Sequence, residues 1–376
     1  MVSISVAMAT FNSANFLPEQ LDSIRNQTLA PKELIVTDDG SSDNTVEIVK
    51  EFAVSSPFPV RIICNPSRMG YRANFMNSFE HHDADVIAVS DQDDIWDIRK
   101  LEIAARSFLD PSVTLFCHDD WLIDDDGSQI GEADVIRLRP NNPPLSFYPL
   151  VNPLNFAIVF RRDLIALSKF WQLSIDTWER GNRMAHDQWL SFIASSYGTI
   201  VFSDEKLVPN RQHANNTYGW TKASVFAKYV DKLRNPGLKY QLLADTVSAR
   251  AHILELASAE VPLAWRARST EAARKYRQLS RRLALRSEIY LGNKLFSRMR
   301  ALNALYKDRA YSRNTSWDLS RASLGRDLIF GTALRRIMIT PTSNKGSSAL
   351  QVARKLDAKM VKISYSLPIT RSQIRN

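Results

Sequence analysis

The clearest indication of the fold comes from the segment VIAVSDQDD, residues 86–94. Its first five residues are apolar or small, which suits a strand buried on both faces, and a polar turn follows at once. Residues 3–9 have the same form and precede a polar turn at 10–12. Residues 34–36 form a third such strand, before the polar turn 38–43. Because parallel strands present their carboxyl ends at one edge, we expect the three turns to converge on one ligand site.

Amphipathic segments separate these strands, a pattern typical of an α/β fold with a mostly parallel sheet and helices on both faces. Residues 16–26 show it best, since Leu17, Leu21 and Ile24 fall on one helical face. Further helices are expected over residues 46–52 and 73–81, and another strand over 60–64. After residue 100 we expect strands at 113–117 and 199–202, a hairpin around Asp126-Gly127, a proline-rich loop at 140–153, and helices at 163–170 and 184–197.

Charge divides the chain of 376 residues into two parts. Its net charge is +9, but residues 226–376 contain 30 lysines and arginines against 10 acidic residues, net +20, so residues 1–225 carry −11. Helical periodicity continues in the basic part, from Tyr240 to about Lys307. We therefore expect an α/β domain over 1–225 and a basic, mainly helical region over 226–376. The basic region favours an anionic partner. Nucleic acid is not expected, because no aromatic motif is interleaved with the basic residues.

Composition narrows the class of protein further. With 44% hydrophobic and 24% charged residues, the chain is neither disordered nor collagen-like. No stretch approaches the ~18 to 20 apolar residues that span a bilayer, and the N-terminus lacks the pattern of a signal peptide. Cys64 and Cys117 are expected to be reduced, buried thiols. Together these features predict a cytoplasmic protein.

The strongest candidate for chemistry is the acidic turn that contains Asp91 and Asp93, directly after the strand 86–90. Clustered carboxylates repel one another unless a cation or solvent screens them. Hard oxygen ligands suit Mg²⁺ or Mn²⁺, which also accept substrate phosphates as ligands. The alternative is a solvated acidic turn, but the position beside two other polar strand ends favours a cation site.

Three further polar clusters each allow a structural and a functional interpretation. Asp39 can accept hydrogen bonds from a base or a ribose, although Ser and Asp in this turn also suit a helix cap. Asp187 begins an expected helix, where an acid is stabilised as the anion, so it is either a cap or a general base. Arg211 can contact a pyrophosphate, and His213 can do so or bind a metal, although a loop histidine often does neither.

Taken together, these motifs resemble the family 2 glycosyltransferases, which have the GT-A fold. The similarity covers roughly residues 1–220, and the Ser-Asp-Gln-Asp-Asp-x-Trp form of residues 90–96 resembles a rhamnosyltransferase-like branch. The matching segments are SVAMATFN at 5–12, QLDSIRNQT at 20–28, ELIVTDDGSSD at 33–43, residues 65–74 and SDQDDIW at 90–96.

The resemblance implies an inverting transfer of a sugar from a nucleoside diphosphate sugar to an acceptor hydroxyl. It implies that Asp93 binds a divalent cation, Mn or Mg, that Asp91 supports the ribose or the metal shell, and that Asp187 is the catalytic base. The residues it places at the nucleotide-sugar are Thr10, Asn12 and Asp39, with Arg72 and Asn74 as further candidates. The chemistry of their own cluster adds Arg211 as a candidate at the nucleotide-sugar and His213 as a candidate metal ligand. Two departures are His186, where the family often has Glu, and Phe11, where a Tyr is common.

We therefore expect a UDP- or dTDP-linked donor and a glycan or lipid-linked acceptor, in the synthesis of surface polysaccharide or lipid-linked glycan. Two alternatives stay open: a Mg-dependent nucleotidyltransferase, and a nucleotide-sugar-binding scaffold without turnover. A nucleotidyltransferase would more naturally carry a glycine-rich basic loop, and residues 9–15 contain neither Gly nor Lys. The region 226–376 is expected either to bind an anionic membrane surface, at the inner face of the plasma membrane, or to pack on the acidic domain. The segment 317–339 could form a basic amphipathic helix with Arg335 and Arg336 near its edge, as a membrane contact would need, but both interpretations stay open.

Overall fold

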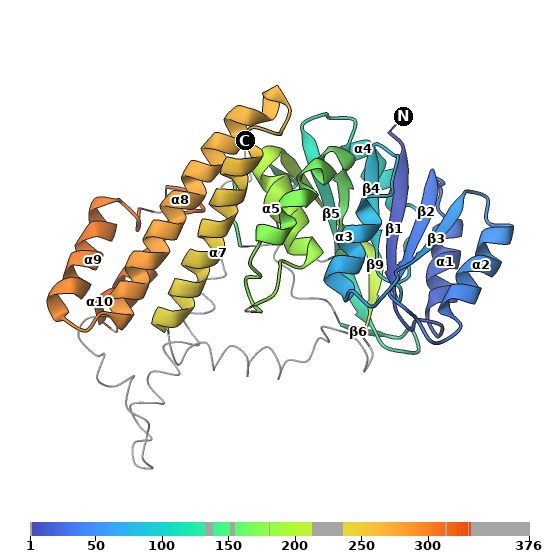
Figure 1. Cartoon of the computed structure of the whole chain (residues 1–376), viewed down its shortest axis with the longest axis horizontal. Helices are drawn as coiled ribbons and strands as arrows, with labels where there is room; N and C mark the ends of the chain where they lie inside the picture. Colours follow the sequence, from blue (N-terminus) through green and yellow to red (C-terminus); the bar gives the residue numbers. More distant parts are fainter. Residues whose placement is uncertain are drawn as a thin grey trace, which may run out of the picture. The chain divides into compact units, whose positions relative to one another are not determined.

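The structure is a computed structural model, shown in Figure 1. It describes residues 2–131, 138–150, 155–179, 181–212, 236–312, 314–329 and 331. The chain forms two compact units. The first comprises Met1–Ser224 and Asp245–Arg277, and the second comprises Val225–Ala244 and Gln278–Asn376. The boundary near residue 225 that the charge distribution suggests stays a prediction.

The first unit is built on a nine-stranded sheet whose N-terminal half is parallel. Its strands β1 to β4 stand in the order β3-β2-β1-β4. Every residue of β1 and β4 is buried, so both faces of the sheet are covered at its centre. The bounds are Ile4–Thr10 for β1, Glu33–Asp38 for β2, Val60–Cys64 for β3 and Val86–Ser90 for β4.

Helices cover both faces of this half because side chains alternate along each strand. Val6 and Met8 point into a core cluster with Leu21 of α1 and Leu101 of α4. The other face meets α3, where the Thr37 hydroxyl donates to the Asn74 carbonyl at 3.3 Å. The bounds are Leu17–Arg25 for α1, Thr45–Ser55 for α2, Tyr71–Phe79 for α3 and Lys100–Ser107 for α4.

The second half of the sheet is mixed. The short strand β8 lies antiparallel between β4 and β5, and β9 runs parallel to β5. The predicted fold class, a mostly parallel sheet between helices, is thus confirmed (Figure 1). The bounds are Val113–Ile123 for β5, Gln129–Gly131 for β6, Asn141–Asn142 for β7, Val159–Arg161 for β8 and Thr199–Arg211 for β9, with the helix α5 at His186–Tyr197 and 3-10 helices at Asn155–Ala157 and Arg162–Leu173.

The helix expected at 163–170 is present as a 3-10 helix over Arg162–Leu173. Two other local expectations were wrong. The loop expected at 140–153 contains the two-residue strand β7. Cys64 is exposed rather than buried, because it ends β3, which is an edge strand of the sheet. Cys117, on the interior strand β5, is buried as expected.

Where the structure describes the basic part of the chain, that part is mainly helical, as predicted. The helices are α7 at Pro236–Ala257, α8 at Leu263–Leu291, α9 at Leu295–Lys307 and α10 at Arg321–Leu328. Within the first unit, Ser269 of α8 forms a 2.9 Å hydrogen bond with the Tyr197 hydroxyl, which joins this helix to α5.

Within the second unit, the buried carboxylate of Asp327 accepts from the guanidinium of Arg286 at 2.9 Å and from the hydroxyls of Tyr290 and Tyr311. Such full hydrogen bonding is what a buried charge requires. Arg335 and Arg336, part of the expected amphipathic segment, lie outside the described residues. Across the described residues, no helix combines the length and apolar character needed to cross a bilayer.

Candidate active site

Three polar turns meet at the carboxyl edge of the parallel strands. Thr10, the last residue of β1, pairs with Asp38 of β2, and Met8 pairs with Ser90 of β4. The backbone N–H of Phe11 donates to the Gln92 amide oxygen at 2.8 Å, and this bond ties the turn after β1 to the acidic turn after β4. The expected convergence of these turns therefore follows from the strand order.

Thr10 and Asn12 hold the first two turns together. The Thr10 hydroxyl donates to Asp38 at 3.1 Å. The Asn12 side-chain oxygen accepts from the backbone N–H of Ser42 at 2.8 Å. Asn12 has a φ of 49°, in the left-handed region that Asn tolerates better than most residues. The two residues thus shape the edge of the site, and their contact with a nucleoside stays a prediction.

Asp39 and Asn74 are almost fully buried, each 2% exposed, and they organise the segment before α3. The Asp39 carboxylate accepts from the backbone N–H groups of Met69 and Gly70, both at 2.7 Å, and from the amide of Asn65 at 3.0 Å. The Asn74 amide donates to the Thr37 carbonyl at 3.0 Å. These bonds anchor the start of α3 beside the ends of β1 and β2. A role for either side chain as a nucleotide ligand stays a prediction.

The acidic turn concentrates negative charge. Asp91 and Asp93 are half-buried, whereas Asp94 is 3% exposed. Burial and the neighbouring charges of Asp91 and Asp93 raise the pKa of Asp94 well above its usual value. Beside it, burial lowers the pKa of Lys100 to about 7, and its ammonium lies 3.7 Å from the centroid of the Trp96 ring.

The donor set of this turn fits a hard divalent cation. The carboxylates of Asp91, Asp93 and Asp94 offer only oxygen, and among the described residues Oδ2 of Asp94 has no hydrogen-bond partner although it is buried. Among the described residues, no three or more His, Cys, Asp or Glu side chains lie close enough together to hold a metal ion by themselves. Mg²⁺ and Mn²⁺ take several ligands from substrate phosphates and water, so an incomplete protein cage is compatible with either ion.

Arg211, at the end of β9, is 3% exposed and contacts the backbone of the acidic turn. Its Nε donates to the Asp93 carbonyl at 3.2 Å, and its Nη1 donates to the Asp125 carbonyl at 2.7 Å. It also forms an ion pair with Glu19 of α1. These contacts give Arg211 a structural role in orienting Asp93, and its contact with a pyrophosphate stays a prediction. His213, the other expected metal ligand, lies outside the described residues.

Asp187 and His186 begin α5. His186 is buried and stacks on Phe75 of α3, with ring centroids 3.9 Å apart. Burial, and secondly the charge of Arg72, lower the pKa of His186 to about 3, so the ring is neutral at physiological pH. Asp187 is half-buried, and its Oδ1 accepts from the backbone N–H of Gln188 at 2.8 Å. The helix N-terminus stabilises its anionic form.

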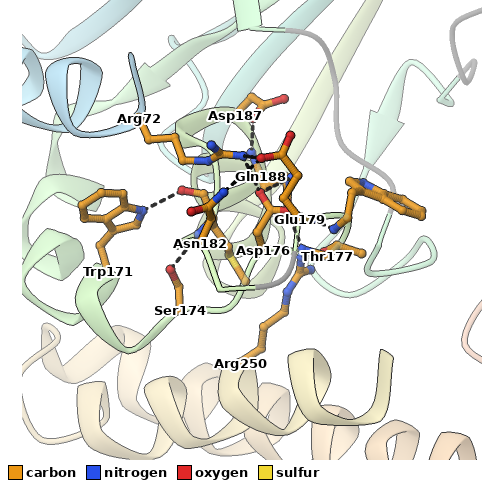
Figure 2. A network of polar contacts seen from close by, with 12 residues as sticks. Arg72, Trp171, Ser174, Asp176, Thr177, Glu179, Asn182, Asp187, Gln188 and Arg250 are labelled. Carbon is orange, nitrogen blue, oxygen red and sulfur yellow. Dashed lines mark hydrogen bonds and ion pairs between the residues drawn. The ribbon is translucent and has the colours of Figure 1, made fainter. Parts of the chain in front are cut away.

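Figure 2 shows how Arg72 reaches from α3 to the loop before α5. Its Nη2 lies 3.2 Å from a carboxylate oxygen of Asp176 and 3.0 Å from one of Glu179. The Gln188 amide donates to the same Asp176 oxygen as Arg72, at 3.2 Å. These two contacts tie α3 to the loop that precedes Asp187, so we describe Arg72 as a brace between them. The expected position of Arg72 at the nucleotide-sugar stays a prediction.

The network contains residues that the sequence analysis did not select. Asp176 is 4% exposed, and Arg250 of α7 is 3% exposed and donates to the Thr177 hydroxyl at 3.3 Å (Figure 2). Burial lowers the pKa of Arg250. Lys100 was likewise not selected. Each of these is a single charged residue with distant partners, so nothing in the local sequence distinguishes it from a surface charge.

Comparison with known proteins agrees with this geometry. The family model described as glycosyl transferase family 2 matches residues 5–166. An uncharacterized glycosyltransferase of Nostoc sp. is 27% identical over 58% of this chain and 67% of its own. The UDP-Glc:alpha-D-GlcNAc-diphosphoundecaprenol beta-1,3-glucosyltransferase WfgD of Escherichia coli is 30% identical over 43% of this chain and 66% of its own. The dTDP-rhamnosyl transferase RfbG of Shigella flexneri is 38% identical over 24% and 32%.

Among solved structures, TarS of S. aureus in complex with UDP covers 74% of this chain and 91% of its own, at 17% identity and a TM-score of 0.44. The mannosyltransferase PcManGT of Pyrobaculum calidifontis, with GDP-Man and Mn²⁺, covers 89% and 87%, at 14% identity and a TM-score of 0.41. The chain spans about a third to two thirds of the length of the curated relatives named above. Residues 5–166 of this chain, which include the acidic turn that follows β4, thus match the model of glycosyl transferase family 2.

Proposed function

We propose that this protein is an inverting glycosyltransferase that moves a sugar from a nucleoside diphosphate sugar to an acceptor hydroxyl. The observation that carries the proposal is the linkage of three polar turns at one sheet edge, through Thr10–Asp38 and Phe11–Gln92 bonds, with the acidic turn among them. This is the edge at which open α/β sheets bind ligands.

The donor diphosphate would lie against the acidic turn. Asp93, supported by Asp91, would hold Mn²⁺ or Mg²⁺, and the ion would neutralise the charge that develops on the departing diphosphate. Arg211 contributes indirectly, since its bond to the Asp93 carbonyl keeps the turn in place. Phe11 adds an aromatic ring at this edge of the sheet. The Arg68 guanidinium lies 3.9 Å from the centroid of that ring.

Asp187 is the proposed general base. It takes the proton from the acceptor hydroxyl as the oxygen attacks the anomeric carbon from the face opposite the diphosphate. The helix N-terminus and the Gln188 N–H keep the carboxylate charged and oriented. His186 is excluded from this step by its surroundings, because its ring is packed between aromatic residues of α3. General base action is typically worth ~10²–10⁴-fold in rate.

The names of the relatives narrow the expected substrates. WfgD is named for a UDP-glucose donor and a diphosphoundecaprenol-linked acceptor, and RfbG for a dTDP-rhamnosyl donor. We propose a UDP- or dTDP-linked donor and a glycan or lipid-linked acceptor for this chain as well, in the synthesis of surface polysaccharide or lipid-linked glycan.

A lipid-linked acceptor would require the enzyme to work at a membrane surface, and α9 is the described element best suited to that task. Its exposed residues include Phe296, 79% exposed, and Tyr306, 68% exposed, with Lys294, Arg300 and Lys307 beside them. Apolar side chains flanked by cations are the composition of helices that lie on anionic membranes. We therefore propose α9 as the part of 226–376 that contacts the membrane.

The activity is tested with a panel of UDP- and dTDP-hexoses, with Mn²⁺ or Mg²⁺, by measuring nucleoside diphosphate release with and without acceptor. The wild type should release nucleoside diphosphate, and excess chelator should stop it. Asp187→Asn should bind the donor but lose transfer by roughly 10²–10⁴-fold, whereas Asp83→Asn, whose side chain is 83% exposed, should act as wild type. Release of pyrophosphate from a nucleoside triphosphate would instead indicate a nucleotidyltransferase. Donor binding with no release would indicate a scaffold.

A further inference from the structure

Lys100 is a lysine in a position that opposes its positive charge in two ways. Its side chain is 0% exposed, so the ammonium has lost its hydration. It is also the first residue of α4, where the positive end of the helix dipole disfavours a cation. A lysine is almost never fully buried unless it is paired, so the surroundings of Lys100 have to compensate for both effects.

Three kinds of group surround the Lys100 ammonium. It donates a hydrogen bond to the Phe156 carbonyl at 2.5 Å, and it lies 3.7 Å from the centroid of the Trp96 ring. Its charge also interacts with the carboxylates of Asp94 and Asp91 in the acidic turn. The carbonyl and the ring stabilise a cation without neutralising it. The acidic turn therefore supplies the compensating negative charge.

Asp94 needs this interaction as much as Lys100 does. It is 3% exposed, and among the described residues its Oδ2 has no hydrogen-bond partner. Three neighbouring carboxylates disfavour a negative charge on Asp94, namely those of Asp91, Asp93 and Asp120, whereas the charge of Lys100 favours it. A buried carboxylate without a counter-charge is strongly destabilising. The shape of the acidic turn therefore depends on the cation beneath it.

We infer that Lys100 is a positioning residue of the proposed cation site: its ammonium neutralises Asp94 inside the protein, so the acidic turn has its shape before Mn²⁺ or Mg²⁺ binds. Asp93, supported by Asp91, then binds the ion, while Asp94 is the interior partner of Lys100. Among the described residues no three acidic or histidine side chains lie close enough together to hold a metal, which agrees with this division. The inference rests on the proposed function, and it adds what holds the metal-binding turn in place.

The first test measures the affinity of the full-length protein for Mn²⁺, by electron paramagnetic resonance of the free ion, with and without UDP or dTDP. This measurement does not depend on turnover. The variants are Lys100→Met, which removes the charge and keeps a long side chain, Asp94→Asn, and the double variant. A thermal melt of each variant shows that it is folded.

The matched control is Arg161→Met. Arg161 also donates to a backbone carbonyl, that of Val113 at 2.9 Å, and its guanidinium lies 5.5 Å from the centroid of the Phe108 ring. It pairs with Val86, the first residue of β4, and so lies at the opposite end of that strand from the acidic turn. A general loss of stability would therefore affect both lysine and arginine variants, whereas a loss of Mn²⁺ affinity should be confined to Lys100→Met.

We expect Lys100→Met to weaken Mn²⁺ binding by roughly tenfold or more, because the uncompensated Asp94 carboxylate moves toward water and displaces Asp93 with it. In the Asp94→Asn background the same substitution should change the affinity by less than about threefold, since no charge is left there to neutralise. Arg161→Met should bind Mn²⁺ as the wild type does.

A second test uses the wild type alone, so it stands even if Lys100→Met does not fold. The N–H of Asp97 donates to the Leu207 carbonyl at 2.8 Å, and that of Lys100 donates to the Asp97 carbonyl at 3.0 Å. If the segment after the acidic turn is ordered without metal, these two amides exchange hydrogen slowly in the metal-free protein. Mass spectrometry of peptides that span residues 95–101 should then show little change when Mn²⁺ is added.

Three results would overturn the inference. Lys100→Met could bind Mn²⁺ as tightly as the wild type, it could lose the same affinity with and without Asp94→Asn, or the two amides could exchange fast until Mn²⁺ is added. Where the wild type binds Mn²⁺ and turns over a donor, each of these removes only the role of Lys100. If the wild type binds no Mn²⁺ with or without UDP or dTDP and turns over no donor, the proposed function itself fails.

Discussion

Replacing Arg72 with Met separates its role as a brace from a role in donor binding. The Arg72 side chain is 16% exposed and contacts two carboxylates, one of which, on Asp176, is 1% exposed. Removing one partner of a buried ion pair typically costs about 3–5 kcal/mol. Asp176 keeps hydrogen bonds from two backbone N–H groups and from Gln188, so we expect a cost below that range, about 2–3 kcal/mol.

A double-mutant cycle tests this magnitude. Asp176→Asn removes the charge that Arg72 neutralises, so Arg72→Met should cost about 1–2 kcal/mol less in that background. The matched control is Arg99→Met, whose partner Glu205 is also 3.2 Å away but whose side chain is 54% exposed. Exposed ion pairs of this kind contribute about 0–1 kcal/mol to the free energy of unfolding, so Arg99→Met should have a small effect.

The free energy of unfolding of the four cycle members and the control is measured by urea denaturation, followed by tryptophan fluorescence. Arg72 does not stabilise the loop before α5 if Arg72→Met lowers the free energy of unfolding by no more than Arg99→Met does. The same conclusion follows if Arg72→Met has the same effect with and without Asp176→Asn. Donor kinetics give the second criterion. A brace lowers transfer with little change in the donor KM, whereas a large rise in donor KM at unchanged stability would show that Arg72 is a donor ligand.

Two further predictions concern acid stability and the membrane. The folded-state pKa of His186 is lowered from 6.5 to about 3, so the unfolded chain takes up a proton in that window and the folded chain does not. Stability therefore falls as pH drops below about 6.5, and His186→Leu should remove about 2 kcal/mol of that loss by about pH 5, measured as urea midpoints against pH. An unchanged dependence of stability on pH in His186→Leu would refute the assignment. Phe296→Glu should abolish flotation with vesicles of anionic phospholipid, whereas Val54→Glu, 90% exposed on α2, should not; flotation that is absent in the wild type would exclude the membrane contact.

The elements that sequence analysis located well are those with strong local signals. The expected strands at 60–64 and 86–90 coincide with β3 and β4, because apolar runs there stop at polar turns. Strand β8 was not anticipated, since it is three residues long within an apolar run and is defined only by pairing with β4 and β5. Strand β9 extends far beyond the expected 199–202. It continues through charged residues, with irregular register against β5 that follows no simple period.

The residues of the candidate site also fall into two groups: those that a local motif identifies, and those that depend on distant partners. Asp91, Asp93 and Asp187 could be selected from the sequence, because each belongs to a motif at the end of a strand or the start of a helix. Asp176 and Arg250 could not, since their function depends on partners far away in the chain, such as Arg72 for Asp176 and Thr177 for Arg250. Tertiary contacts made by single charged residues leave no pattern in one sequence.

The most direct test of the account is donor turnover by three proteins under identical conditions: the wild type, Asp93→Asn and Asp187→Asn. We predict that the wild type transfers sugar to an acceptor hydroxyl with inverted anomeric configuration, which NMR of the product detects. We also predict that Asp187→Asn binds donor without transferring it, and that Asp93→Asn loses the response to Mn²⁺. A product with retained configuration, or transfer by Asp187→Asn at the wild-type rate, would contradict the assignment of an inverting transfer with Asp187 as its base.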